Sequence, residues 1–528
     1  MHSVTFAPAL LVSFTLGIAT APAAAQRPPR RPQPAAAAAD QQTPAREDAV
    51  KSAAAADTVE DSSVTLHTIR VGNQTVPYRA MAATLILRND SGAPIGRIYY
   101  TAYTRTDVHD PATRPLSFIY NGGPGSASMW LHMGAFGPRR IVTSDASPTP
   151  PPPYRLVDNA NTLLDVTDMV FIDPVGTGFS KPVGKGTGKD FWGIDEDGRS
   201  LQQFVSQYVS RNSRWNSPKY LIGESYGTTR SAVLVNLLQG REGMDFNGVV
   251  LISSVLDFET LNFAPGHDIS YVLYLPSYAA TAIYHHALPQ PANLAAFLDT
   301  VRQWAAGPYT TALEKGSALA GEERASVLRQ LAAYTGLGTD YLDKADLRVS
   351  LGQFMVELQR AHGQVTGRLD ARFSGPESDL LSEYAGDDPQ SDAISGAFTA
   401  AINMYLRDEL KYGGTQRYVT GGDVQWNWNR GGRNGGWRGT PYVGGDLANA
   451  LSYNPNLRVE IENGYYDLAT PFYATEYTMD HLGLRPDLRS HVGLKYYDAG
   501  HMMYLREADL GQLKSNIAQF IGATHAAP

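Results

Sequence analysis

Hydrophobic and polar residues alternate with a period of two through residues 64–104. This alternation is typical of β-strands that bury one face and expose the other. The segment Asn89-Asp90-Ser91-Gly92 interrupts it with residues that favour turns. We therefore expect an antiparallel sheet at the start of the folded region.

Short, continuous apolar runs then replace the alternation, and amphipathic helical patterns lie between several of them. Leu201, Phe204, Val205 and Tyr208, for example, fall on one face of a helix. Strands that alternate with helices predict an α/β fold with a mostly parallel central sheet covered on both faces. The predicted core strands are residues 116–120, 169–172, 220–222, 249–252 and 457–461.

Short apolar runs typical of strands are missing between residues 257 and 445. Helical patterns dominate there, for example at 293–304, 325–334 and 397–410. A loop rich in glycine and tryptophan follows at residues 426–437. We expect a helical cap insertion at 257–445 between two parts of one α/β core, 58–256 and 446–528.

The N-terminus has the pattern of a secretory signal. An apolar run at residues 8–20 is followed by the small residues Ala21 to Ala25, which predicts a signal peptide at residues 1–25. A Pro- and Ala-rich linker, too polar to fold, is expected at 26–57. We thus expect export to a bacterial periplasm or to the medium, with an uncleaved anchor or a disordered tail as the alternatives. No later segment has about 20 uninterrupted apolar residues, so no stable membrane insertion is expected after cleavage.

Composition excludes several classes of chemistry. The 528 residues contain no cysteine, which rules out thiol catalysis, and the formal net charge of -8 disfavours a nucleic-acid partner. No H-E-x-x-H pattern occurs, and His285-His286 lacks a spaced acidic partner, so no metal and no cofactor is expected. The sequence leaves the oligomeric state open.

The segment Gly223-Glu224-Ser225-Tyr226-Gly227 fits the G-x-S-x-G nucleophile elbow of α/β-hydrolases. A predicted strand leads into it and a helical pattern leads out, which is the context this motif requires. The α/β core is therefore predicted to have the α/β-hydrolase fold, with Ser225 as nucleophile.

A serine nucleophile needs a base, and this fold supplies an acid and a histidine later in the chain. Asp467 follows the predicted strand 457–461, and His501 follows the apolar run 494–497. We expect Asp467 to orient the imidazole and His501 to transfer the proton. The oxyanion hole should combine the amide of Tyr226 with an amide from the loop Asn121-Gly122-Gly123-Pro124-Gly125.

The sequence resembles the serine carboxypeptidases from about residue 116 to residue 504. Four ordered blocks carry the resemblance: residues 121–126 (NGGPGS), 173–180 (DPVGTGFS), 223–227 (GESYG) and 500–502 (GHM). It implies hydrolysis of C-terminal residues from peptides through an acyl-enzyme. It also implies the triad Ser225, Asp467 and His501, oxyanion donors at Gly123 and Tyr226, and a site for the substrate carboxylate formed by Asn121, Gly122 and Glu224.

The chain departs from the family pattern at three positions. The family keeps a second acid that shares a proton with the residue at Glu224, but Ala135 stands at that place, which puts the acid optimum and strict carboxyl-terminal recognition in doubt. Ser126 and Thr470 occupy positions where the family has cysteines. The loss of both cysteines fits a bacterial form of the family that has no disulfides. Arg139 and Arg140 are nearby cations, which we expect to be surface residues.

Two other functions fit the same residues. The nucleophile could act on esters or in acyl transfer, as in plant relatives of this family. Alternatively, the chain could be a non-catalytic binding protein on a hydrolase fold, although such proteins usually lose the serine or the histidine.

Overall fold

The structure, a computed structural model, describes residues 57–430 and 440–525. The predicted signal peptide and nearly all of the predicted linker therefore lie outside the described residues, as do residues 431–437 of the Gly/Trp-rich loop.

The alternating segment forms three long antiparallel strands, as predicted. β1 (Ser62–Val71) pairs with β2 (Gln74–Arg88), and β2 pairs with β3 (Pro94–Arg105). Between β2 and β3, the Asn89 side chain accepts a hydrogen bond from the Ala93 amide at 2.9 Å, and Gly92 has a φ of 78°. Asparagine and glycine thus close this turn for the reasons that the sequence suggested.

These three strands continue into one mixed sheet with the order β1-β2-β3-β7-β4-β9-β10-β13-β14, and β8 pairs with β3. From β7 to β14 all neighbouring pairs are parallel, which confirms the predicted mostly parallel core. The remaining strands of this sheet are β4 (Leu116–Tyr120), β7 (Asp168–Asp173), β8 (Lys181–Pro182), β9 (Lys219–Glu224), β10 (Gly248–Ile252), β13 (Arg458–Gly464) and β14 (Val492–Tyr497). Two small antiparallel pairs join β5 (Arg139–Ile141) to β6 (Leu156–Asp158) and β11 (Gln364–Thr366) to β12 (Ser374–Pro376).

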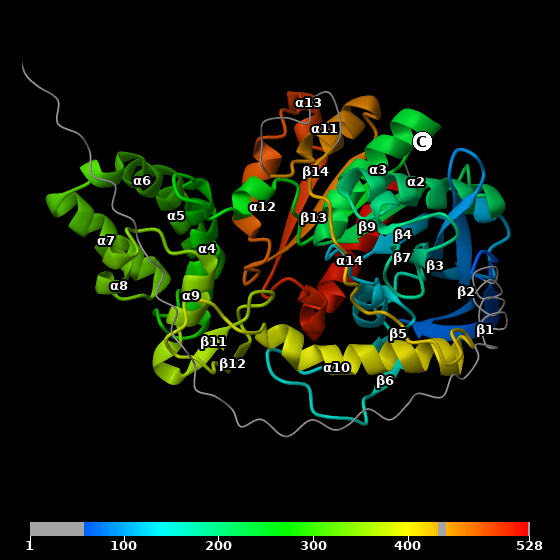
Figure 1. Ribbon diagram of the computed structural model, residues 1–528, viewed down its shortest axis with the longest axis horizontal. Coiled ribbons are helices and arrows are strands. Elements are labelled where there is room, and N and C mark those ends of the chain that lie inside the picture. The colour runs from blue at the N-terminus through cyan, green and yellow to red at the C-terminus, as the bar shows by residue number, and fades with distance from the viewer. Residues whose placement is uncertain (1–56, 431–439, 526–528) are drawn as a thin grey trace, which may run out of the picture. The chain divides into compact units, whose positions relative to one another are not determined.

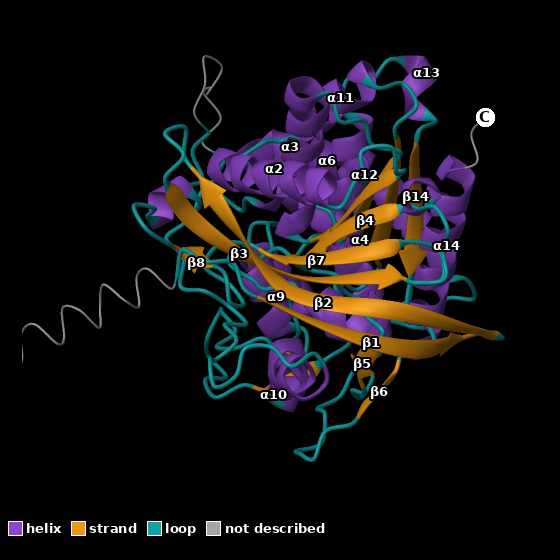
Figure 2. Cartoon of the chain, turned by 90° about the vertical axis from the view of Figure 1, so that its right-hand side faces the viewer, coloured by secondary structure: helices purple, strands orange, loops and turns teal. Residues whose placement is uncertain are grey.

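Helices cover both faces of the sheet (Figure 2). α2 (Ile194–Arg211), α3 (Tyr226–Glu242) and α11 (Gly444–Tyr453) bury their apolar residues in one core cluster. α10 (Pro389–Met404) and α14 (Glu507–His525) pack in a second cluster on the opposite face. The continuous apolar runs of the central strands are therefore buried on both sides, as parallel sheets require.

The chain between β10 and β13 is mainly helical (Figure 1). Those of its helices that precede α10 share a third apolar cluster with Tyr466, Leu468 and Phe472, which lie just beyond the end of β13. This segment therefore packs directly on the loop that carries Asp467. Its helices before α10, together with those that follow β13, are α4 (Ile269–Tyr284), α5 (Leu294–Trp304), α6 (Thr310–Lys315), α7 (Gly321–Thr335), α8 (Thr339–Lys344), α9 (Leu351–Glu357), α12 (Phe472–Asp480) and α13 (Pro486–Arg489).

The apolar segment at residues 271–288 corresponds mostly to α4, which contains Pro276. Nearly all of α4 is buried against neighbouring helices. Within residues 57–430 and 440–525, no helix is long and apolar enough to cross a bilayer.

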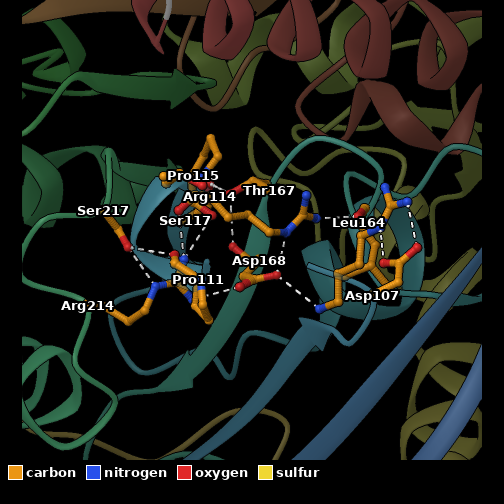
Figure 3. A network of polar contacts seen from close by, with 12 residues as sticks. Asp107, Pro111, Arg114, Pro115, Ser117, Leu164, Thr167, Asp168, Arg214 and Ser217 are labelled. Carbon is orange, nitrogen blue, oxygen red and sulfur yellow. Dashed lines mark hydrogen bonds and ion pairs between the residues drawn. The ribbon is translucent and has the colours of Figure 1, made fainter. Parts of the chain in front are cut away.

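A buried ionic network joins the N-terminal ends of β7, β4 and β9 (Figure 3). The carboxylate of Asp168, the first residue of β7, lies 2.7 Å from Arg114 Nε and 2.7 Å from Arg214 Nη1. The same two arginines also donate to backbone carbonyls, Arg114 to Leu164 at 2.5 Å and Arg214 to Arg114 at 2.7 Å. The network fixes the starts of the strands whose opposite ends carry the candidate active site.

Replacing Asp168 by alanine is expected to destabilise the fold by about 3–5 kcal/mol, because it leaves two buried guanidinium groups without their anion. Urea unfolding would measure this as a lower midpoint at an unchanged slope. Asp107 provides a matched control, since it pairs with Arg105 at 2.5 Å but is 41% exposed. Asp107→Ala should leave the midpoint nearly unchanged. Equal midpoints for the two variants would contradict a structural role for the network.

Candidate active site

Ser225 lies in the sharp turn between β9 and α3. Its backbone has φ 60° and ψ -130°, a conformation that non-glycine residues rarely adopt, and its amide donates to Ile252 O at 3.0 Å. A Cβ at Gly223 would lie only 2.3 Å from Gly227 O, so the flanking glycines are required for the turn to close. The side chain of Ser225 is partly exposed in an otherwise buried surrounding. The segment thus has the strained geometry of a nucleophile elbow.

Asp467 and His501 meet beyond the ends of β13 and β14, although 34 residues separate them in the chain. His501 Nδ1 lies 2.8 Å from Asp467 Oδ2, and both side chains are at most 3% exposed. Burial alone would lower the pKa of His501, but the charge of Asp467 and the hydrogen bond to it outweigh burial and raise this pKa. The pair is therefore arranged for a carboxylate to hold one tautomer of the imidazole and to stabilise its cation.

Four donors hold the Asp467 carboxylate in place. Oδ1 accepts from the amides of Ala469 at 2.8 Å and Thr470 at 2.9 Å. Oδ2 accepts from Thr470 Oγ1 at 2.7 Å in addition to His501. The hydroxyl at Thr470, which stands where the family has a cysteine, therefore helps to orient the carboxylate.

Backbone contacts bring the loops of Ser225 and His501 to the same edge of the sheet. The Ser225 amide is bound to the carbonyl of Ile252, the last residue of β10, and the next residue, Ser253, donates its hydroxyl to His501 O at 2.7 Å. Glu224 and His501 lie close enough for each charge to affect the pKa of the other. The three predicted triad residues thus follow β9, β13 and β14 at one edge of the sheet, with the end of β10 between the first two.

The loop at residues 121–125 packs directly on the elbow. A Cβ at Gly122 would lie 2.4 Å from the Tyr226 amide nitrogen, so only glycine permits this approach. Gly123 has a φ of 103°, and its amide forms no hydrogen bond within the described part of the chain. The amide of Tyr226 lies at the first position of α3, where helices leave N–H groups without internal partners. Both predicted oxyanion donors are therefore free to bind an external oxygen.

Asn121 and Glu224 are buried together beside the elbow. Asn121 Nδ2 donates to Glu224 Oε1 at 2.8 Å, and Asn121 Oδ1 accepts from the Leu131 amide at 3.0 Å. Burial raises the pKa of Glu224 to about 7, although the nearby His501 and the bond from Asn121 act in the opposite direction. Glu224 Oε2 has no hydrogen-bond partner within the described residues. A neutral Glu224 could therefore accept or donate one further hydrogen bond.

Arg230 contacts the loop at residues 121–125 through a buried hydrogen bond. Its side chain is fully buried, pairs with Asp197 at 2.7 Å and donates from Nη1 to Asn121 O at 2.5 Å. The rings of Tyr120 and Tyr226 each lie 5.3 Å from the guanidinium carbon. Arg230, which lies on α3, therefore links this helix to the loop at residues 121–125.

The block at residues 173–180 contacts the chain just after the loop at residues 121–125. The carboxylate of Asp173 accepts from the Ser128 amide at 2.8 Å, and Ser180 Oγ donates to Asp173 O at 2.7 Å. A Cβ at Gly178 would overlap the Asp173 carboxylate. This block of the resemblance is therefore structural.

The departures from the family pattern have simple structural consequences. Ala135 is fully buried, and no other carboxyl group is recorded as a hydrogen-bond partner of Glu224 within the described residues. Arg139 pairs with Asp158 and Glu409, and Arg140 with Glu507, so both are engaged by acids outside the triad. Their side chains are 25% and 18% exposed, so they are half-buried rather than the surface residues that we predicted.

Sequence reasoning missed several residues that shape the site. The Tyr504 hydroxyl is buried near Glu224 and Asn121 and lowers the pKa of Glu224, yet a tyrosine two residues after the 500–502 motif gives no signal. Asp388 caps α10 through the Ser391 amide and accepts from the amides of Arg368 and Leu369. The pair Asp388-Pro389 was the available signal, because aspartate followed by proline is typical of a helix start.

Aromatic residues line the other side of Tyr226. The ring of Trp426 lies 5.1 Å from that of Tyr226, and Trp428, which is 40% exposed, lies 6.0 Å away. The first part of the Gly/Trp-rich loop thus reaches the elbow. Across the described ranges, no group of three or more potential metal ligands is placed to hold an ion.

Comparisons with known proteins cover this site in part. The serine carboxypeptidase family model matches residues 93–263, roughly a third of the chain. Pheromone-processing carboxypeptidase KEX1 of Saccharomyces cerevisiae is 37% identical over 135 residues, which is 24% of this chain and 17% of that protein. Serine carboxypeptidase S10 family member 1 of Dictyostelium discoideum is 25% identical over 169 residues, which is 30% of this chain and 34% of that protein. The aligned segments therefore span about a third or less of these relatives.

One solved structure extends the likeness to most of the chain. The crystal structure of KEX1(delta)p, a prohormone-processing carboxypeptidase from Saccharomyces cerevisiae, has a TM-score of 0.50 at 16% identity, covering 85% of this chain and 91% of that one. At this identity the likeness establishes the fold alone. Asp467 and His501 lie outside the family match, so their roles rest on the geometry described above. The chain has the α/β-hydrolase fold that its sequence predicts, and its residues 93–263 are similar to the serine carboxypeptidases.

Proposed function

We propose that this protein is a serine-type carboxypeptidase that hydrolyses C-terminal residues from peptides through an acyl-enzyme, with Ser225, His501 and Asp467 as its triad. The observation that carries the proposal is the buried Asp467–His501 hydrogen bond at the sheet edge where the strained Ser225 turn lies. The similarity of residues 93–263 to serine carboxypeptidases adds the substrate class.

In the proposed reaction, His501 Nε2 accepts the proton of Ser225 Oγ as the oxygen attacks the scissile carbonyl carbon. The amides of Gly123 and Tyr226 bind the resulting oxyanion. His501 then gives the proton to the leaving amine, and the C–N bond breaks to leave an ester on Ser225. A water molecule repeats the sequence, losing its proton to His501 and releasing the shortened peptide as Ser225 regains a proton.

We propose that Asn121, the Gly122 amide and Glu224 bind the terminal carboxylate of the substrate. Because the pKa of Glu224 is about 7, its protonated form can donate a hydrogen bond to that carboxylate in acid. Above this pKa the two groups carry like charges, and the charged Glu224 also favours the protonated form of His501, which cannot act as base. Both effects lower activity as the pH rises.

For wild type, kcat/KM on free-acid peptides is thus expected to fall up to about tenfold per pH unit above pH 7, mainly through KM. Glu224→Gln, which keeps a neutral donor, should remove this alkaline decline. Steady-state kinetics between pH 5 and 9 would show it, with Glu242→Gln at the far end of α3 as control. An unchanged decline in Glu224→Gln would exclude Glu224 as the responsible group.

The second candidate is an esterase or acyltransferase, which the absence of an acid at Ala135 favours. Rates on an N-blocked dipeptide, its C-terminal amide and its methyl ester separate the two functions. A carboxypeptidase should prefer the free acid over the amide, whereas an esterase should hydrolyse only the ester. A binding protein without catalysis should cleave none of them and leave Ser225 unlabelled by a fluorophosphonate.

We further propose export to a periplasm or to the medium, which rests on the signal-like pattern at residues 1–25. The relatives described above come from yeast and Dictyostelium, so the bacterial origin rests on the cysteine-free sequence alone. Sequencing the N-terminus of the mature protein would test the predicted cleavage near Ala25.

A further inference from the structure

The turn between β11 and β12 lies on both loops that carry the catalytic acid and base. Arg368 O accepts from the Leu468 amide at 3.1 Å, and Leu369 O accepts from the His501 amide at 2.6 Å. A Cβ at Gly500 would lie 2.4 Å from the Cα of Asp370, so the contact is close. The backbone of Arg368 is therefore fixed next to the triad.

The Arg368 side chain is exposed and has no hydrogen bond or ion pair with any residue in the described ranges. Its charge nevertheless reaches the triad, because it opposes protonation of His501. An arginine in this place is thus a cation beside the imidazole without a partner of its own.

The neighbouring acids are already occupied. Asp388 Oδ2 accepts from the amides of Arg368 at 2.8 Å and Leu369 at 3.0 Å, and its Oδ1 accepts from the Ser391 amide at 3.0 Å. All four donors of Asp467 are described above, and none is Arg368. Glu224 is the other nearby acid, and burial keeps it neutral below about pH 7.

Other arginines around the site already have anions of their own. Arg230 pairs with Asp197, Arg372 with Asp370 at 2.7 Å, and Arg430 with Asp195 at 2.8 Å. Arg139 and Arg140 pair with acids outside the triad, as described above. Of the arginines named here, Arg368 is therefore the one without a paired anion in the described ranges.

We infer that Arg368 is a specificity-determining residue that binds a carboxylate of the leaving residue. His501 must reach the leaving amine to protonate it, so the residue being released lies beside the imidazole and within range of Arg368. A guanidinium binds a carboxylate strongly and with defined geometry. This inference rests on the proposed peptidase function and adds a substrate preference to it.

The test compares wild type, Arg368→Gln and Arg368→Lys on N-blocked dipeptides at pH 6, where Glu224 is largely neutral. The peptides end in free leucine, leucine amide, free glutamate or glutamate α-amide. Arg368→Gln should lower kcat/KM by about 10- to 100-fold on the recognised carboxylate, mainly through KM, and should leave leucine amide unchanged. Arg368→Lys should recover part of the loss. Arg241→Gln, at the far end of α3, removes another exposed arginine and should change nothing.

The peptides identify which carboxylate is bound. If the α-carboxylate is the ligand, the loss appears on both free-acid peptides. If the side-chain carboxylate is the ligand, the loss appears only on the two glutamate peptides. A loss of equal size on leucine amide, or no loss on any peptide, would overturn the inference.

Calorimetry on variants that cannot turn over separates this inference from the proposed function. Ser225→Ala should bind the preferred carboxylate peptide at least tenfold more tightly than Ser225→Ala/Arg368→Gln does, and the two variants should bind leucine amide equally well. If wild type cleaves no peptide, the proposed function fails, yet the binding difference still decides the role of Arg368. Equal binding by the two variants would overturn that role.

Discussion

Ser225→Ala is expected to reduce kcat for peptide hydrolysis by about 10⁶-fold, the effect typical of removing a serine nucleophile. The variant keeps the backbone of the elbow, because the hydrogen bond from the residue 225 amide to Ile252 O does not involve the side chain. It should therefore fold normally and still bind substrate. Active-site titration with a fluorophosphonate should label wild type once, at Ser225, and should not label the variant.

Ser452→Ala is the matched control, because it removes the same hydroxyl from an exposed position on α11. Its kcat should equal that of wild type. If Ser225→Ala retained more than about a hundredth of wild-type activity, another nucleophile would be responsible and the account would be wrong.

Asp467→Asn is expected to lower kcat by about 10⁴-fold with little change in size or packing. Asp467 Oδ1 accepts from two backbone amides, so the oxygen of an asparagine should occupy that place. Its NH₂ group would then face His501 Nδ1. The imidazole would carry its proton on Nε2 instead and could not accept one from Ser225.

The pH profile distinguishes this explanation from simple misfolding. Asp467 raises the pKa of His501. The apparent pKa of the acid limb of the kcat/KM profile in wild type should therefore lie above the ordinary histidine pKa of about 6.5. In Asp467→Asn this limb should move to lower pH. Asp498→Asn, an exposed acid three residues before His501, should leave both the rate and the limb unchanged. An unshifted limb in Asp467→Asn would show that the carboxylate does not act on the imidazole.

Much of the fold followed from local sequence patterns. The alternating segment predicted β1 to β3, because strands buried on one face alternate in polarity. The continuous apolar runs predicted the central parallel strands, which are buried on both faces. The short strand β8 was not predicted. The elbow was also predictable, since its glycines are required at close approaches whatever surrounds them.

The residues that the sequence did not reveal act through tertiary contacts. Tyr504 lies near Glu224 only after α14 and the loop before it are placed. Arg368 gains its proposed role because the turn between β11 and β12 packs on the loops of Leu468 and His501. No local pattern records such long-range proximity.

The central claim is that Ser225 removes residues one at a time from a free carboxyl end. Mass spectrometry of one decapeptide during digestion tests it directly, with the C-terminal amide of the same decapeptide alongside. The account predicts a ladder of single-residue losses from the C-terminus of the free acid, a much slower ladder from the amide, and no ladder with Ser225→Ala. Internal cleavage, or a ladder that persists in Ser225→Ala, would contradict it.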